Sequence, residues 1–532
     1  PTNSIKYILT ENSISLSDIN YVVFYEKPFL KFERLLETYL SFAPKGFLSF
    51  SKSMPIWVKQ KLFMKDMILK SLKAIDSNLD PKDKLYFSEH HLSHAASAYF
   101  PSNFSEAIVL TADGVGEYAT TTVAIAKENK LEIKKEISFP HSLGLLYSAF
   151  TYYLGFKVNG GEYKLMGLAP YGEPIFKEKI YKYLIDVKND GSFNLNQEYF
   201  NYCTGLTMTS KKFNSLFENP VRNPEKDDIT QFHMDMASSI QKVIEEIILN
   251  IVRNLKKEFN IKNLCLAGGV ALNCVANGKI YKEKIFENIF VQPAAGDAGG
   301  AIGSALAFWH LELNKKKPIN KNRDSMKGSY LGPSFSDNQI KNSLNELGAI
   351  YESYDQNEII KKTAKLLAEG KSCGWFQGKM EFGPRALGNR SILADPRSEV
   401  MQKNLNLKIK YRESFRPFAP SILAEKVNQW FDFDGESPYM LMVAEVVEDQ
   451  KRRVNNEDQK LKGLQKLNVN RSQIPAVTHV DYSARIQTVN YIDNPLYYKL
   501  IKAFYEITNV PILVNTSFNI RGEPIVCSVE DA

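Results

Sequence analysis

Three histidines fall within five positions of this chain, and two of them are spaced to bind one metal ion. His90 and His94 are four residues apart in a predicted helix, so both imidazoles project from one face, one turn apart. His91 lies about 100° around that helix from His90, off the ligand face. A zinc protease is disfavoured, because His91 stands where H-E-x-x-H has its glutamate. Surface histidines at a helix start are the alternative.

Two carboxylates follow strand-like segments and could complete the metal site. Asp113 opens Asp-Gly-Val-Gly-Glu, where Gly114 and Gly116 would let backbone N–H groups approach a ligand. Asp297 stands in a similar glycine-rich loop before a predicted helix. Two histidines with two carboxylates suit iron or zinc better than magnesium. A plain hairpin turn at Asp113 is the alternative.

Two glycine-containing loops could hold phosphate or nucleotide groups. Gly268 and Gly269 separate a predicted strand from a helix, with Asn273 close behind, so a nucleotide could approach the helix N-terminus. An ordinary tight turn fits the same residues equally well. Lys164 lies in a glycine-flanked loop and could meet a phosphate as a point charge, or be a plain surface lysine.

The second half of the chain carries arginines whose neighbours are glycine, proline and aromatic residues. Arginines in such contexts are typically held for bidentate anion binding. Asn515 and Ser517 follow an apolar strand-like run and add amide and hydroxyl partners. We expect a site for ATP and a second phosphate compound, with pairing to carboxylates as the alternative. The arginines are Arg385, Arg390, Arg412, Arg416 and Arg485.

The elements that must position these residues alternate in an α/β pattern. Strand-like runs separated by short turns predict an antiparallel meander, and strand, glycine turn and helix then follow one another twice. A basic, proline-containing stretch near 314–323 predicts a linker and places a domain boundary at 335/336. The expected strands are 85–87, 107–112, 120–126, 131–137, 264–267 and 289–292, and the expected helices are 90–100 and 234–259.

Composition narrows the class of protein. The 532 residues are 44% hydrophobic and 24% charged, which excludes disorder, collagen and a disulfide scaffold. Five cysteines without ligand spacing fit a reducing cytoplasm, and no apolar run is long enough to span a bilayer. A net charge of +7 over this length permits anionic substrates without indicating nucleic acid. The first residue is not Met, so we expect the chain to be a fragment of a longer protein.

Four motifs occurring in this order resemble the NodU/CmcH family of O-carbamoyltransferases. They are Glu89–Ala98, Gly161–Gly172, Gly383–Ser391 and Asn515–Asn519. The resemblance implies an ASKHA/RNase H-like, two-lobed domain over residues 1–335 and a YrdC-like α/β domain over residues 336–532. It implies that the second domain forms carbamoyl-adenylate from carbamoyl phosphate and ATP with Mg²⁺. The first domain would then transfer the carbamoyl group to a hydroxyl of a sugar or natural product.

The resemblance also implies roles for the residues singled out above. The metal would be Fe²⁺ first, with Zn²⁺ or Mn²⁺ as alternatives. Lys164 is an expected catalytic residue. His91 is expected to be the acceptor-side base because of its position next to the ligand face of the predicted helix, independently of the resemblance. The metal ligands would be His90, His94, Asp113 and Asp297; adenylate would rest on Gly268, Gly269 and Asn273, with Gly114 and Gly116 also contacting ligand; and the five arginines, Ser391, Asn515 and Ser517 would hold ATP and carbamoyl phosphate.

Three other classes of protein stay open at this stage. One is the tRNA threonylcarbamoyl-adenosine type of modification enzyme, one an ASKHA sugar kinase, and one a non-catalytic metal-dependent binding protein. For a carbamoyltransferase we expect a small-molecule acceptor, no nucleic-acid partner and no membrane partner. A homodimer is left open.

Overall fold

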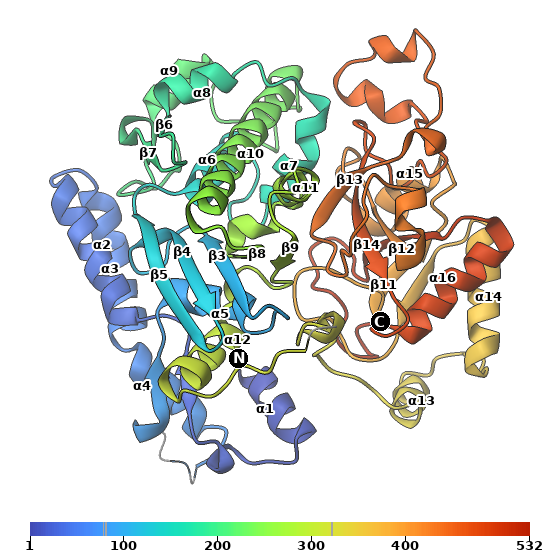
Figure 1. The fold of residues 1–532 in the computed structure, drawn as a ribbon, viewed down its shortest axis with the longest axis horizontal. Coiled ribbons are helices and arrows are strands. Elements are labelled where there is room, and N and C mark those ends of the chain that lie inside the picture. The colour runs from blue at the N-terminus through green and yellow to red at the C-terminus, as the bar shows by residue number, and fades with distance from the viewer. Residues whose placement is uncertain (78, 80–81, 321–322) are drawn as a thin grey trace.

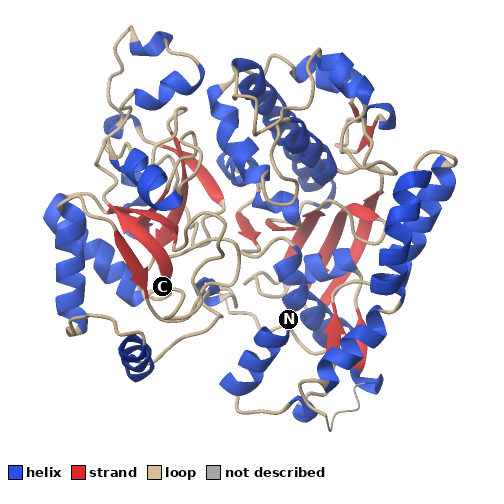
Figure 2. Cartoon of the chain, turned by 180° about the vertical axis from the view of Figure 1, so that it is seen from behind, coloured by secondary structure: helices blue, strands red, loops and turns tan. Residues whose placement is uncertain are grey.

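The computed structural model describes residues 1–77, 79, 82–320 and 323–532, and its two main sheets lie in successive halves of the chain (Figure 1). The first half contains a five-stranded sheet and the second a six-stranded sheet. Seen from behind, helices surround both sheets, and loops fill the space between the halves (Figure 2). The predicted α/β class with two successive domains is confirmed. The boundary at 335/336 falls between the two sheets and stays a prediction.

The first sheet begins as the predicted meander. Strands β3, β4 and β5 pair antiparallel, and β8 and β9 extend the sheet in parallel from β3. The apolar run of β3 is almost entirely buried, as expected for a central strand. The strand order is β5-β4-β3-β8-β9, with bounds β3 (Glu106–Ala112), β4 (Ala119–Lys127), β5 (Lys130–Ser138), β8 (Asn263–Ala267) and β9 (Asn288–Val291).

Two short helices that approach each other closely frame the site of interest. Helix α5 (His90–Tyr99) packs on β3 and β8, and α12 (Asp297–Ala307) packs on α5. A Cβ on Gly303 of α12 would lie 1.8 Å from the carbonyl oxygen of Ser93 in α5. Only glycine permits this approach, so the first residues of both helices are held side by side. The long helix α10 (Gln231–Phe259) packs on α6 (Leu143–Tyr153).

The second sheet is mixed. Strands β12 and β14 are parallel, and its other pairings are antiparallel. Helices α14 (Gln356–Ala368) and α16 (Pro495–Thr508) pack together beside it. The order is β10-β11-β15-β12-β14-β13, with bounds β10 (Cys373–Phe376), β11 (Arg390–Ala394), β12 (Ala419–Leu423), β13 (Met442–Glu445), β14 (Ser483–Val489) and β15 (Ile512–Ser517).

The other elements complete the two halves, and the predicted strand β2 is among them. None of the helices in the described ranges is long and apolar enough to cross a membrane. The bounds are α1 (Thr2–Glu11), β1 (Val22–Phe24), α2 (Pro28–Phe42), α3 (Phe47–Trp57), α4 (Met64–Lys73), β2 (Leu85–Phe87), α7 (Glu162–Leu168), α8 (Lys177–Tyr183), β6 (Ile185–Val187), β7 (Phe193–Leu195), α9 (Lys211–Phe217), α11 (Cys274–Lys282), α13 (Asp337–Glu346) and α15 (Met401–Leu405).

Direct contacts join the two halves. Helix α11 packs on β13, and the side-chain amide of Asn277 donates to the carbonyl oxygen of Leu441 at 3.1 Å. The hydroxyl of Tyr171 donates to the carbonyl oxygen of Phe415 at 2.9 Å. A Cβ on Gly278 would lie 2.1 Å from the carbonyl oxygen of Val443. The halves therefore meet backbone to backbone at this helix.

We expect Gly278→Ala to lower the free energy of unfolding by about 1–3 kcal/mol, the usual cost of overpacking. The added methyl group would push α11 away from β13, and this outweighs the gain in helix propensity. Urea denaturation measures the change. Gly160→Ala is the matched control, because a Cβ at Gly160 meets no atom within 4 Å. Equal stability of the two variants would contradict a tight interface at α11.

Candidate active site

The four predicted metal ligands converge. The Nε2 atoms of His90 and His94 are 3.1 Å apart, and the Nε2 of His90 lies 3.1 Å from the Oδ2 of Asp113. The Oδ1 of Asp297 is 3.6 Å from both histidine nitrogens. All four ligand atoms lie within 4.8 Å of one another. Among the described residues, these four form the group that could hold a metal ion.

The geometry of this cluster fits a metal ion. Ligand atoms bound at about 2.1 Å in a tetrahedron are about 3.4 Å apart, close to the separations seen here. Two nitrogens and two carboxylate oxygens suit iron or zinc. The Nδ1 of His90 has no hydrogen-bond partner among the described residues, and its nearest carboxylate oxygen belongs to Glu26, at 4.0 Å. A small movement would let Glu26 orient the imidazole, as carboxylates beside metal-binding histidines do.

The local charges keep the aspartates ionised. Burial disfavours the charged form of His94, but hydrogen bonds and charges from Asp113 and Asp297 outweigh it and raise the pKa of His94 to about 9. Burial alone would raise the pKa of Asp113, yet its contacts with His90 and His94 hold it well below the usual range. The hydrogen bond from His94 likewise lowers the pKa of Asp297, against burial. The cluster is therefore anionic on its carboxylate side, as a cation site requires.

The glycines near the cluster have packing roles that the structure makes visible. Gly268 has a φ of +85°, and a Cβ there would lie 2.2 Å from the carbonyl oxygen of Ala112. The backbone N–H of Gly269 donates to the Oδ1 of Asp113 at 3.1 Å. A Cβ on Gly116 would lie 2.9 Å from the ring of His91, whereas a Cβ on Gly114 would meet nothing within 4 Å. Their predicted contacts with a ligand stay predictions.

His91 lies next to the cluster on the same helix, and Asn273 lies four residues after Gly269, whose N–H bonds Asp113. The Nδ1 of His91 is 3.3 Å from the hydroxyl of Thr122, and the residue is only 3% exposed. Burial, followed by the nearby His94 and His90, lowers the pKa of His91 to about 3. The Asn273 side chain caps α11 and bonds Gln241. The base role of His91 and the adenylate role of Asn273 stay predictions.

Most of the predicted anion-binding residues line one cavity. It has a volume of about 460 Å³ and lies on the second sheet, where β15 ends. Seven predicted residues line it, namely Lys164, Arg385, Arg412, Arg416, Arg485, Asn515 and Ser517.

The arginines of this cavity are largely without counter-charges. Among the described residues, Arg385, Arg412 and Arg485 form no ion pair with a carboxylate, and the Nε atoms of Arg385 and Arg485 have no partner. Glu413 pairs with Lys164 at 2.6 Å and with Arg416 at 3.6 Å. Burial, then the charge of Arg485, lowers the pKa of Arg385 to about 9. Burial, then Arg416, lowers the pKa of Arg412 to about 9. An anion in the cavity would relieve this repulsion.

Two residues predicted to bind ATP and carbamoyl phosphate, Arg390 and Ser391, lie outside the lining of this cavity, and their binding roles stay predictions. Arg390 is fully buried in β11, stacks over Phe376, and donates to the carbonyl oxygens of Gln377 at 2.6 Å and Pro333 at 3.0 Å. Ser391 accepts a hydrogen bond from the backbone N–H of Gly388. Arg390 therefore ties loops to the sheet.

Lys410, which was not among the predicted residues, also lines the cavity, together with Asn519, the last residue of the Asn515–Asn519 motif. Lys410 is buried, and its ammonium donates to the Oδ1 of Asn519 at 2.8 Å and to the backbone and hydroxyl oxygens of Ser517. Burial, then Arg412 and Arg416, lowers the pKa of Lys410 to about 7. The available signal was spacing, because Lys410 lies two residues before Arg412 and Asn519 two residues after Ser517.

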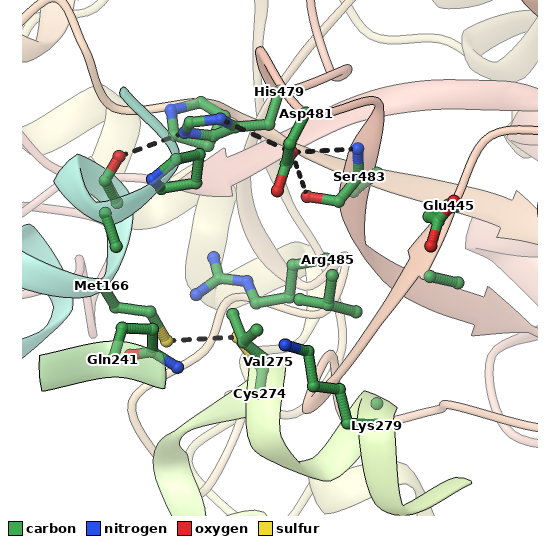
Figure 3. Close-up of a pocket in the computed structure, with 18 of the residues that line it drawn as sticks. Met166, Gln241, Cys274, Val275, Lys279, Glu445, His479, Asp481, Ser483 and Arg485 are labelled. Atoms are coloured by element: carbon green, nitrogen blue, oxygen red, sulfur yellow. Dashed lines mark hydrogen bonds and ion pairs between the residues drawn. The ribbon is translucent and has the colours of Figure 1, made fainter. Parts of the chain in front are cut away.

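A second cavity lies between the two halves and has a volume of about 650 Å³. Arg385, Arg412, Arg416 and Arg485 line both this cavity and the first. In Figure 3 the guanidinium of Arg485 points between Cys274 and Met166 of the first half and His479 of the second.

A short segment links this cavity to the group formed by His90, His94, Asp113 and Asp297, which we call the metal-type cluster. The turn η6 (Gly269–Leu272) begins at the N–H that bonds Asp113, and Cys274 lines the cavity five residues after Gly269. The linking segment is about 10 Å long at the rise of a 3₁₀-helix. The metal-type cluster therefore lies close to the four arginines that line both cavities.

This two-domain α/β protein combines a metal-type cluster with a cationic cavity, as in enzymes that act on anionic substrates. Residues 1–306 match the family profile described as Carbamoyltransferase N-terminus, and residues 364–532 match Carbamoyltransferase C-terminus. The chain therefore belongs to the carbamoyltransferase family and is a transferase enzyme.

Individual relatives agree with this. An uncharacterized protein of Synechocystis is 56% identical over all of this chain and 87% of its own length. The nodulation protein NolNO of Sinorhizobium fredii is 36% identical over all of this chain and 71% of its own length. The 3'-hydroxymethylcephem-O-carbamoyltransferase of Amycolatopsis lactamdurans is 32% identical over 50% of this chain and 44% of its own length. The predicted NodU/CmcH-type family is confirmed.

We expect His94→Ala to weaken metal binding by more than about 100-fold, since loss of even an outer-shell partner costs 10–100-fold. Elemental analysis of protein purified with added Fe²⁺ or Zn²⁺ measures the metal retained. His91→Ala is the matched control, because His91 is on the same helix but outside the cluster. Equal metal content in the two variants would show that His94 is not a ligand.

We expect anion binding to weaken as the pH rises through about 7, where Lys410 loses its proton in the ligand-free protein. A bound anion favours the ammonium form, so binding takes up a proton above that pH. Sulfate, which does not titrate here, should bind several-fold less tightly at pH 8.5 than at pH 6.5, as measured by calorimetry. Lys410→Met should flatten this dependence, and Lys408→Met, an exposed lysine on the same turn, should keep it. An equal pH dependence in Lys410→Met would exclude Lys410 as its source.

Proposed function

We propose that this enzyme is an ATP-dependent O-carbamoyltransferase. The second domain forms carbamoyl-adenylate, and the first domain transfers its carbamoyl group to a hydroxyl of a small acceptor, a sugar or natural product. The observation that carries the proposal is the wall of four arginines shared by two cavities. Residues of the second domain form most of the smaller cavity, to which the first domain adds Lys164, and the larger cavity lies between the two domains.

The first step requires a site for several phosphate groups at once. Carbamoyl phosphate and ATP react, with consumption of one water, to give carbamoyl-adenylate, phosphate and pyrophosphate. Arg412 is oriented by the side-chain oxygen of Asn406 at 2.7 Å, and Lys410 by Ser517 and Asn519. Such fixed donors stabilise the charge that develops on the departing phosphates without reorganisation. We assign ATP and carbamoyl phosphate to this cavity, with Mg²⁺ accompanying ATP.

The second step transfers the carbamoyl group. The acceptor oxygen forms a bond to the carbamoyl carbon, AMP leaves, and the hydroxyl proton passes to a base. A metal ion held by His90, His94, Asp113 and Asp297 would supply Lewis acidity for the carbamoyl oxygen. Fe²⁺ is our first choice, with Zn²⁺ and Mn²⁺ as alternatives. His91, next to the ligand face, is the proposed base, and Lys164 the proposed cation near adenylate.

The proposed class of acceptor is supported by the names of relatives of this chain rather than by a contact in the structure. One relative is named for O-carbamoylation of a 3'-hydroxymethylcephem and another as a nodulation protein. Neither name refers to tRNA, so a small-molecule hydroxyl is the better candidate. Mass spectrometry of sugars, nucleotide sugars and natural-product alcohols incubated with the enzyme, ATP and carbamoyl phosphate would identify the acceptor. Carbamoylation of tRNA alone would contradict the proposal.

The first step can be tested without knowing the acceptor. The 532-residue protein should exchange labelled pyrophosphate into ATP only when carbamoyl phosphate is present. Arg385→Ala and Arg416→Ala should each slow exchange more than about tenfold, because each removes a charge-assisted contact of about 1.5–3 kcal/mol. Arg453→Ala, an exposed arginine of the same domain, should leave the rate unchanged. Unchanged exchange in both cavity variants would exclude the cavity as the adenylation site.

A further inference from the structure

A run of helix at the edge of the first domain carries an unusual outer surface. Helix α3, the π-helical turn η2 (Val58–Leu62) and α4 follow one another with only Phe63 between η2 and α4. Figure 1 shows α2 and α3 at the edge of the molecule farthest from the second domain. Exposed residues recur along this run every three or four positions, the period of a helix. We call them the outer stripe: Leu48, Lys52, Ile56, Lys59, Phe63, Met67 and Lys70.

The apolar members of the outer stripe are large and open to solvent. Leu48 is 73% exposed, Phe63 55%, Ile56 53% and Met67 45%. Phe47, next to Leu48, is 71% exposed. Single exposed apolar residues are ordinary, but a row of them marks a surface that binds something.

The charge of this segment has one sign. Residues 45–73 contain seven lysines and a single acidic residue, Asp66. Lys61 pairs with Glu26 at 2.9 Å. By contrast, the stripe lysines Lys52, Lys59 and Lys70 form no ion pair with any residue in the described part of the chain. A partner that covers the stripe must therefore offer negative charge and an apolar surface together.

We propose that the outer stripe binds the surface of an anionic lipid bilayer. Large apolar side chains alternating with lysines are typical of helices that lie in the membrane interface, with the apolar groups among the acyl chains and the ammonium groups at the headgroups. Nucleic acid would match the lysines but not Leu48, Ile56 and Phe63. The lack of a spanning segment underlies the expectation of no membrane partner, but a helix that lies on a bilayer requires no spanning segment.

The inner side of the same helices adjoins the metal-type cluster. Lys61 binds Glu26, whose other carboxylate oxygen is 4.0 Å from the Nδ1 of His90. One helix diameter, about 10 Å, therefore separates a bound bilayer from the residues beside the cluster. Membrane binding does not depend on which acceptor the enzyme uses.

The test is sedimentation of the metal-loaded 532-residue protein with lipid vesicles. It should sediment with vesicles containing phosphatidylglycerol and not with pure phosphatidylcholine, and high salt should release it. Lys52→Glu/Lys59→Glu/Lys70→Glu should lower the affinity at least tenfold, since each lysine near an anionic surface contributes about fivefold. The matched control, Lys341→Glu/Lys361→Glu/Lys371→Glu, makes the same charge change on exposed lysines of the second domain and should bind normally.

A second pair of variants separates the apolar contribution from charge. Leu48→Ser/Phe63→Ser should also lower vesicle binding, and Ile350→Ser/Ile492→Ser, which alters two exposed residues elsewhere, should not. Because all these side chains are exposed, the variants should fold, and circular dichroism checks this. Absence of vesicle binding, or equal loss in the controls, would overturn the proposal. It would also be overturned by a wild-type dimer that Leu48→Ser/Phe63→Ser converts to monomer without changing vesicle binding.

Discussion

Mutual repulsion among half-buried arginines is the constraint around which the second domain and its contact with the first are arranged. Arg385, Arg412, Arg416 and Arg485 share one wall, and one carboxylate, Glu413, serves Arg416 and Lys164. Removing such charges from water is costly unless an opposite charge is provided. The fold holds them in place with neutral groups, as Asn406 does for Arg412. The cavity is thus kept short of negative charge, which an anionic ligand can supply.

The metal-type cluster has the opposite charge balance, and it depends on a close approach between helices. His90 and His94 come from α5, and Asp297 begins α12. Because Gly303 lets α12 lie against Ser93 of α5, the two helix starts meet in front of the strand end that carries Asp113. Two carboxylates therefore face two imidazoles at one end of the linking segment, and unpaired cations lie at its other end. The charge of the cluster therefore favours a cation, and the charge of the arginine-lined cavity favours an anion.

The sequence alone could predict the metal-type cluster because local rules set where its side chains point. Helical spacing puts His90 and His94 on one face, and strand ends bring Asp113 and Asp297 to the same edge of the sheet, because β3, β8 and β9 are parallel. Four of the five arginines that have neutral neighbours in the sequence line one cavity. The fifth, Arg390, is buried against backbone carbonyls, a setting in which a cation has equally neutral neighbours in the sequence. Lys410 was missed because its burial comes from tertiary packing, and before folding it resembles the surface lysines around it.

The arrangement of the two cavities bears on how a reactive intermediate could be handled. A carbamoyl-adenylate is a mixed anhydride that water hydrolyses, so an enzyme that made it in one domain and used it in another would need a path that limits bulk water. The four arginines line both cavities, so a phosphate group could move from one to the other without leaving cationic surroundings. Close packing at Gly278 holds α11 on β13 and so fixes one wall of the cavity between the halves. The interface between the domains is therefore part of the candidate site itself, because neither half alone encloses this cavity.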